Sequence, residues 1–150
     1  MKVETHSRLG RAWFVFALAL ACHVADEATH DFLSVYNPNA LAIRARFPFL
    51  PIPTFTFREW LAGLLAGIVL LLCLTPLANR GVRWIRVAAF PLAIVVGIAN
   101  GLAHIISSIY FHRLMPGVLS SPLLIAAGAW LFLSARSVHA KVAAESGRYN

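Results

Sequence analysis

The sequence predicts an all-α integral membrane protein, a four-helix bundle that forms a single membrane domain. Hydrophobic residues make up 59% of the 150 residues and charged residues only 13%, and the mean hydropathy of +0.73 is far from that of a soluble globular protein. A membrane helix needs roughly 20 apolar residues, and four stretches reach or nearly reach this length. They are residues 12–33, 60–78, 87–111 and 118–135.

The first stretch follows three basic residues, a pattern that it shares with signal peptides. Ala19-Leu-Ala-Cys22 also approximates a lipoprotein cleavage site, but the large aliphatic residue preferred at the position of Ala19 is missing. We therefore expect the first stretch to remain in place as a membrane helix.

Residues 34–59 are predicted to form a long, ordered loop on the outer side of the membrane. Pro48, Pro51 and Pro53 disfavour a regular helix. Its many aromatic side chains would bury themselves against the mouth of the bundle or the lipid headgroups. A lid over a site and an interfacial anchor are both compatible with this composition.

The other three stretches are also assigned to helices. None alternates apolar and polar residues as a barrel strand does, and the glycine and proline residues within them are tolerated in membrane helices.

Glu59 comes directly before the second stretch. Because a negative charge stabilises a helix N-terminus, we predict a capping role for Glu59.

The basic residues predict that both termini lie in the cytoplasm. One side of the predicted bundle carries nine of them: Lys2, Arg8, Arg11, Arg80, Arg83, Arg86, Arg136, Lys141 and Arg148. The other side carries four: Arg44, Arg46, Arg58 and Arg113. Because cytoplasmic loops carry the excess of Lys and Arg, the orientation is N-in and C-in.

The formal charge of +7 does not indicate nucleic-acid binding, since the basic residues form short clusters between apolar runs and not one basic face. Cys22 and Cys73 each lie inside an apolar run, which excludes a disulfide-stapled secreted domain. The expected partner is the lipid bilayer.

Five ionisable residues lie in the nine positions 23–31, on the continuation of the first apolar stretch. Placing one carboxylate in lipid costs about 2.5–3.5 kcal/mol on insertion scales, so these side chains need partners or water. At 100° per residue, His23, Asp26, Glu27 and His30 fall within an arc of roughly 100°. The four side chains therefore share one face of the helix.

A second polar stripe lies on the third stretch. Asn100 and His104 are four residues apart and share a face, and Gly97 and Gly101 beside them permit the close approach of a neighbouring helix. The first and third spans run in the same direction and carry their polar residues at matching depths. We predict that the two stripes face each other in one pocket that opens to the outer side.

This pocket is suited to a divalent metal ion. Imidazole and carboxylate groups are ligands for zinc, iron or manganese, and facing helices build metal sites from such residues. Two carboxylates with neutral histidines leave an uncompensated negative charge, since none of the thirteen Lys and Arg residues lies within a central span. The predicted ligands are His23, Glu27, His30 and His104.

The same residues are compatible with other functions. Without a metal, Asp26, Glu27 and the histidines would move protons on an apolar substrate, with Asn100 orienting it, as in an isomerase. A structural network that holds two helices together is a third interpretation. Metal binding is favoured because six polar groups converge.

Three short motifs resemble those of the bacterial membrane proteins named for an HxxEE motif. The segment His23–Glu27 resembles that motif with Asp26 at its first acidic position, and Asn100–His104 matches the NxxxH motif fully. Leu114–Gly117 resembles the YxPG motif with Leu in place of Tyr. The resemblance implies that His23, Asp26, Glu27, Asn100 and His104 are the functional set. It implies neither a substrate nor a metal, because the family is uncharacterised in activity.

The preferred function is a small metal-dependent enzyme of the bacterial inner membrane that acts on a lipid-like or other apolar substrate. A metal-free acid/base enzyme, a transporter component and a structural subunit are the alternatives. Transport favours a polar path through the whole membrane, yet residues 13–21 contain no charged residue or hydrogen-bonding residue other than Trp13. A site open to one side is therefore expected.

Overall fold

The structure is a computed structural model that describes residues 2–146, and the side chains of residues 7–137. The described chain is helical, with no strand between residues 2 and 146. Its elements are α1 (Lys2–Thr29), α2 (Phe32–Arg46), α3 (Phe57–Cys73), α4 (Thr75–Asn79), α5 (Arg83–Pro91), the π-helix η1 (Leu92–Ala99), α6 (Asn100–Tyr110) and α7 (Ser121–Ser146).

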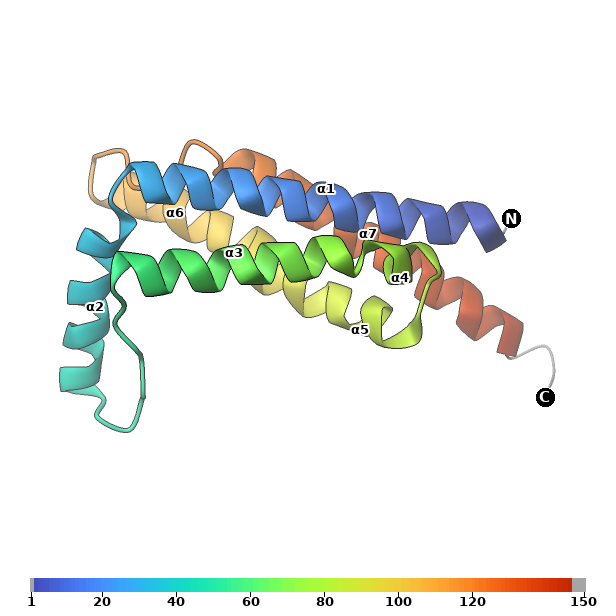
Figure 1. The fold of residues 1–150 in the computed structure, drawn as a ribbon, viewed down its shortest axis with the longest axis horizontal. Coiled ribbons are helices and arrows are strands. Elements are labelled where there is room, and N and C mark those ends of the chain that lie inside the picture. Colours follow the sequence, from blue (N-terminus) through green and yellow to red (C-terminus); the bar gives the residue numbers. More distant parts are fainter. Residues whose placement is uncertain (1, 147–150) are drawn as a thin grey trace.

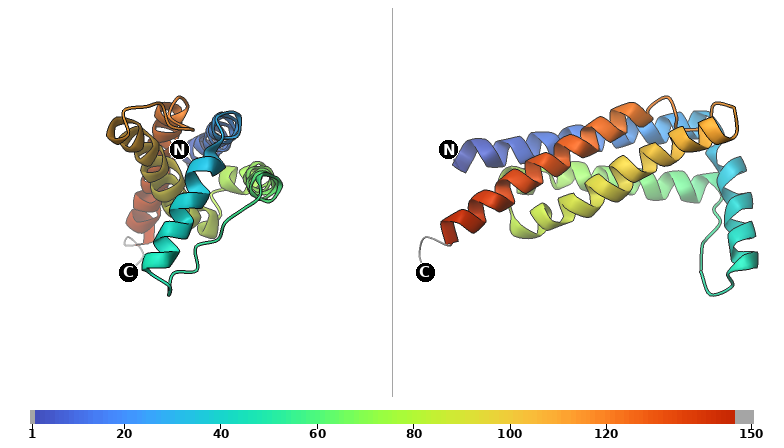
Figure 2. Two further views of the ribbon diagram at one scale, coloured as in Figure 1. Left: turned by 90° about the vertical axis from the view of Figure 1, so that its left-hand side faces the viewer. Right: turned by 180° about the vertical axis from the view of Figure 1, so that it is seen from behind.

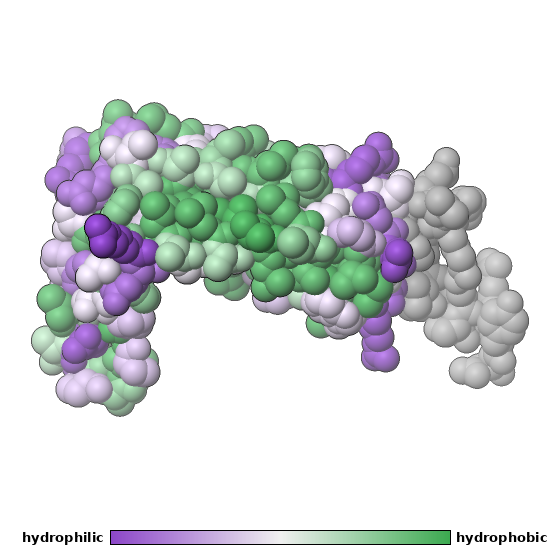
Figure 3. Space-filling model, viewed as in Figure 1, coloured by the Kyte–Doolittle hydropathy of each residue, from purple (hydrophilic) through white to green (hydrophobic). Residues whose placement is uncertain are grey.

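Three helical segments of the described residues are long and apolar enough to cross a membrane: Ser7–Thr29, Phe57–Asn79 and Arg83–Tyr110. They lie side by side with α7, and α2 crosses one end of them (Figures 1 and 2). Helix α1 packs against α7, α3 and α4, and α7 packs against α5, η1 and α6. The surface in Figure 3 is hydrophobic along the middle of these helices and hydrophilic at both ends.

The core lies between α1, α7 and η1. Trp13, Phe16, Leu124 and Leu131 are fully buried there. Glycines bring the helices close together, as the sequence predicts: a Cβ atom on Gly97 would lie 3.0 Å from the Cα atom of Gly128. Gly101 likewise faces α7, so α7 is the neighbour that approaches the third span.

Helix α1 ends earlier than predicted, at Thr29 and not at residue 33. Asp31 adopts the left-handed conformation with φ of 53°, which a helix cannot continue through. The chain turns there and starts α2 across the end of the other helices. As a result, His30 lies beyond the end of α1. Its place in the predicted pocket was based on the assumption that the helix continues through this residue.

The predicted loop 34–59 is only partly a loop, because residues up to Arg46 form α2. Pro38 lies inside this helix, where its ring removes one hydrogen bond. The carbonyl that loses this hydrogen bond belongs to Ser34, four residues earlier. Ser34 is exposed, so water can donate to its carbonyl instead. The irregular segment 47–56 contains the three prolines that the prediction used.

Side chains of α2 hold the segment 47–56 in place. The Asn37 side chain pairs with both backbone groups of Phe55: Nδ2 donates to the carbonyl at 2.9 Å, and Oδ1 accepts from the amide at 3.1 Å. The ring of Tyr36 stacks on that of Phe55 at 6.0 Å between centroids. These contacts support the expectation of an ordered, aromatic-rich segment.

Glu59 caps the N-terminus of α3, as predicted. Its carboxylate accepts hydrogen bonds from the backbone amide and the hydroxyl of Thr56, at 2.9 and 2.8 Å, and the Thr56 hydroxyl accepts one from the Glu59 amide. This reciprocal pair is a capping box. Glu59 is therefore committed to the helix end.

The third span is one continuous rod from Arg83 to Tyr110, but its middle, η1, is a π-helix. It begins directly after Pro91, which has no amide hydrogen to donate. A π-helical segment changes the angular register of everything that follows it, and such segments are frequent at functional sites. Here the residues that follow are Asn100 and His104.

Candidate metal centre

Three buried side chains from α1 and α6 meet at the end of the helices where α2 lies. The Oε1 atom of Glu27 is 3.1 Å from Nε2 of His104 and 3.6 Å from Nε2 of His23. The three residues are between 0% and 8% exposed. The predicted meeting of the two polar stripes is thus confirmed.

Local structure explains this convergence. His23 and Glu27 are one helical turn apart on α1, which points both side chains to the same side. His104 reaches them from α6, and its ring meets that of His23 edge to face, with 4.9 Å between centroids. Their three nitrogen and oxygen ligand atoms lie within 4.8 Å of one another, which is compact enough for one metal ion to bridge them.

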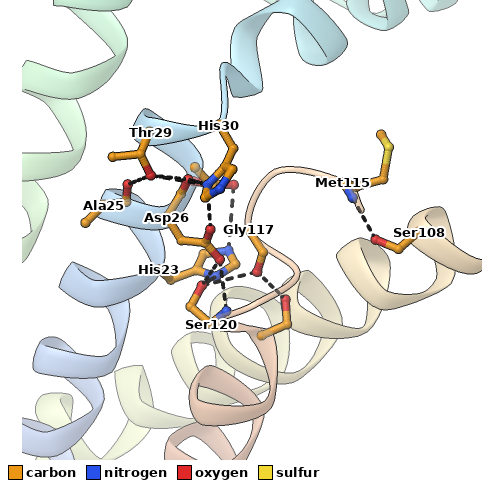
Figure 4. Close-up of polar contacts among 11 residues, drawn as sticks. His23, Ala25, Asp26, Thr29, His30, Ser108, Met115, Gly117 and Ser120 are labelled. Atoms are coloured by element: carbon orange, nitrogen blue, oxygen red, sulfur yellow. Dashed lines mark hydrogen bonds and ion pairs between the residues drawn. The ribbon is translucent and has the colours of Figure 1, made fainter. Parts of the chain in front are cut away.

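Ser120, the residue before α7, fixes the protonation of the His23 ring. Its hydroxyl lies 2.8 Å from Oδ2 of Asp26 and 2.9 Å from Nδ1 of His23. Since the carboxylate only accepts, the hydroxyl hydrogen points to Asp26, and the hydroxyl oxygen accepts the hydrogen of Nδ1. The lone pair of the ring then lies on Nε2, the atom that a metal ion would use. Figure 4 shows His23, Asp26 and Ser120 close together.

Asp26 lies outside the group formed by His23, Glu27 and His104 and supports it. Its Oδ2 atom also accepts a hydrogen bond from the Ser120 amide at 2.9 Å, at the N-terminus of α7, where negative charge is favourable. Its Oδ1 atom lies 2.9 Å from Nδ1 of His30. Both oxygens are therefore occupied, and Asp26 joins α1 to the start of α7.

His30 was predicted to be a metal ligand, but the structure places it elsewhere. Its side chain is half exposed and its Nδ1 atom contacts the Asp26 carboxylate and backbone carbonyl. It is absent from the group formed by the ligand atoms of His23, Glu27 and His104. The end of α1 at Thr29 is the physical reason for this difference.

Asn100 joins the site as predicted, with its Nδ2 atom 3.1 Å from Nε2 of His23. An amide nitrogen donates, so this contact agrees with the lone pair that Ser120 leaves on that ring atom. Asn100 is the first residue of α6, directly after η1. The π-helix thus sets the direction in which this side chain points.

Gly117 forms the wall of the site next to both imidazoles. Its φ of +83° favours glycine, and a Cβ atom there would lie 3.0 Å from ring atoms of both His104 and His23. Its carbonyl accepts a hydrogen bond from Ser121 at 2.7 Å. This backbone can lie against the two rings because it carries no side chain.

Replacing Ser120 with alanine should change the tautomer of His23. The wild-type ring is expected to carry its hydrogen on Nδ1, and the variant should show a mixture because the acceptor for that hydrogen is gone. The 15N chemical shifts of the imidazole nitrogens measure the ratio. Ser137→Ala, at a serine that bonds only within α7, is the control, and an unchanged spectrum in Ser120→Ala would contradict the assignment.

Fold and site together define a class: an all-helical protein with three segments in its described part that are apolar enough to cross a membrane, and a buried His/Glu/His group at one end. Residues 13–131 match the family described as "Protein of unknown function with HXXEE motif", and the chain belongs to this family. No curated protein and no solved structure matches the chain.

Proposed function

We propose that this protein is a metal-dependent enzyme of the bacterial inner membrane that acts on a lipid-like or other apolar substrate. One observation carries the proposal: ligand atoms of His23, Glu27 and His104, all buried, lie within 4.8 Å of one another. Two imidazoles and a carboxylate are a ligand set of catalytic zinc sites, which leave a further position open for water or substrate.

The charges around the site support a metal ion. A buried carboxylate needs a compensating charge, and no Lys or Arg is buried among residues 7–137. A divalent cation would supply that charge. Zinc, iron and manganese all suit nitrogen and oxygen ligands, and the bound ion would activate a water molecule or polarise a substrate oxygen.

Asn100 would take a role beside the metal. If the cation occupies the His23 Nε2 lone pair, the Asn100 amide group has to turn so that Oδ1 and not Nδ2 faces the site. That orientation suits an oxygen ligand or the positioning of a bound water. Asn100 is therefore assigned to orient the reacting group.

The rest of the interior favours an enzyme over a transporter. Beyond His23, toward the N-terminus of α1, the helix packs into an apolar core that includes Phe16, Trp13 and Leu9. A transported ion would need polar groups along this path. The buried His/Glu/His group instead lies at one end of the helices, with this apolar core on its other side.

A metal-free acid/base enzyme is the second candidate, and the short contact between Glu27 and His104 favours it. At 3.1 Å the pair is within the distance for direct proton transfer. In this case Glu27 would act as the base and His104 as its proton-sharing partner. Metal content of the active protein distinguishes the two candidates.

The proposed topology has four spans with both termini in the cytoplasm. Helix α7 would be the fourth, because it lies beside the other three and buries Leu124, Ala127 and Leu131 against them. The nine-to-four distribution of Lys and Arg residues gives the orientation. The metal site then lies in the outer half of the membrane.

Cysteine labelling of intact cells tests this orientation. With Cys22 and Cys73 replaced by alanine, a membrane-impermeant maleimide should modify Arg44→Cys and leave Val142→Cys unmodified, because position 44 lies in the outer segment. Both positions should react after the cells are lysed. Labelling at position 142 alone in intact cells would reverse the orientation and move the site to the cytoplasmic side.

A further inference from the structure

A cavity of about 460 Å³ lies next to the candidate metal centre, between α2 and the segment that follows α6. Val35, Phe111 and Leu114 are among its apolar lining residues, and Arg113, His30 and Asn39 are among its polar ones. A cavity that combines an apolar wall with a cationic group suits an amphiphilic, negatively charged molecule.

The cavity lies just beyond the ends of two membrane-crossing segments. These segments end at Thr29 and Tyr110, and the lining residues come from 30–39 and 111–116. Helix α2 crosses this end of the helices (Figure 2). In a bilayer this is the depth of the lipid headgroups.

The charge of the cavity favours an anion. No carboxylate lines it, and within the described part of the chain the Arg113 side chain has no hydrogen-bond or ion-pair partner, since only its backbone amide is bonded, to the carbonyl of Ser108. Two acids lie close to the lining residues in the chain: Asp26 is already engaged by Ser120 and His30, and Asp31 is exposed and does not line the cavity. The Arg113 guanidinium is therefore free to pair with a phosphate group.

We propose that this cavity binds the phosphate headgroup of an anionic phospholipid, with its acyl chains along the apolar wall. The polypeptide backbone connects this cavity directly to the candidate metal centre. Met115 and Pro116 line the cavity, and the next residue, Gly117, lies against the rings of His23 and His104. The lipid is the substrate of the enzyme proposed above, and this part of the inference rests on that proposed function. The binding of the lipid to the cavity does not depend on a metal.

Native mass spectrometry of the protein in a neutral detergent, titrated with phosphatidylglycerol, tests the binding. Arg113→Gln should weaken the apparent affinity about tenfold or more, the size expected for one lost charged hydrogen-bond pair. Arg58→Gln is the matched control, because Arg58 is also an exposed arginine at this end of the helices but does not line the cavity. It should change the affinity less than about twofold.

Two further measurements test where the lipid binds and whether phosphate alone is sufficient. Asn39→Trp fills the cavity without changing charge and should also weaken phosphatidylglycerol binding about tenfold, and inorganic phosphate should bind far more weakly than the lipid. Equal losses in the Arg113 and Arg58 variants, unchanged binding in Asn39→Trp, or equal affinity for inorganic phosphate would each overturn the proposal. Zinc content measured on the same samples should stay unchanged, which separates a failure of this site from a failure of the metal centre.

Discussion

Glu27→Gln should lower the affinity of the protein for zinc at least about a hundredfold. Outer-shell partners alone are worth 10- to 100-fold in metal affinity, and Glu27 supplies the only carboxylate of the proposed ligand group. Glutamine keeps the size of the side chain and removes its charge. The measurement is zinc retained after dialysis against a graded series of chelator concentrations.

Glu59→Gln is the control for this experiment. The two substitutions are chemically identical, but Glu59 caps α3 through Thr56 and lies outside the ligand group. It should lower stability slightly, as the loss of a helix cap does, and leave zinc retention unchanged. Equal zinc retention in the Glu27 and Glu59 variants would rule out Glu27 as a ligand.

The same Glu27 variant separates the three interpretations of the site. If gently purified, active protein contains no metal and Glu27→Gln abolishes activity, the acid/base mechanism replaces the metal mechanism. If the variant keeps its activity and only melts at a lower temperature, the group is a structural network. Each outcome combines the same two readouts, activity and metal content.

Gly117→Ala is expected to have the second-largest effect, because it acts on both histidines at once. A non-glycine residue at a φ of +83° costs about 1–3 kcal/mol. The added methyl group would also lie 3.0 Å from both rings, and the ring of His23 is fixed by Ser120 and Asn100. The variant should melt at a lower temperature and lose zinc affinity together.

Gly67→Ala provides the matched control. A Cβ atom on Gly67 would meet nothing within 4 Å, and alanine in a helix interior is more favourable than glycine by about 0.5–1 kcal/mol. The control variant should therefore be unchanged or slightly more stable in detergent. If Gly117→Ala retains zinc as well as Gly67→Ala does, the close wall at Gly117 has no role in the site.

The meeting of His23, Glu27 and His104 could be predicted from the sequence because intramembrane charge and helical periodicity restrict it strongly. A carboxylate such as Glu27 needs partners in lipid, and the spacings of His23 to Glu27 and Asn100 to His104 put each pair on one face. The predicted topology then gave both stripes the same depth. These are local and energetic arguments that need no tertiary structure.

Ser120 could not be found in this way. A serine just before a helix is common as a cap, and nothing local distinguishes one that also contacts Asp26 and His23 from α1. Gly117 was noted only as part of a motif. Its role depends on how closely the loop before α7 approaches the rings, which is a tertiary feature.

The errors of the prediction have a shared local cause. Asp31, which adopts the left-handed conformation, ends the helical periodicity from which His30 was placed, and α2 starts directly after it, inside what was predicted to be a loop. Residues with a positive φ are uncommon outside glycine, although Asp is one of those that adopt it. No pattern in this sequence indicates such a turn before the structure is known.

Equilibrium dialysis against zinc, followed by elemental analysis, tests the metal centre most directly. Zinc is a suitable probe because nitrogen and oxygen sites bind it more tightly than ferrous iron or manganese. We expect one zinc ion per chain in the wild-type protein and almost none in the double variant His23→Ala, His104→Ala. Equal zinc content in the two proteins, or no zinc in the wild type, would contradict the proposed site.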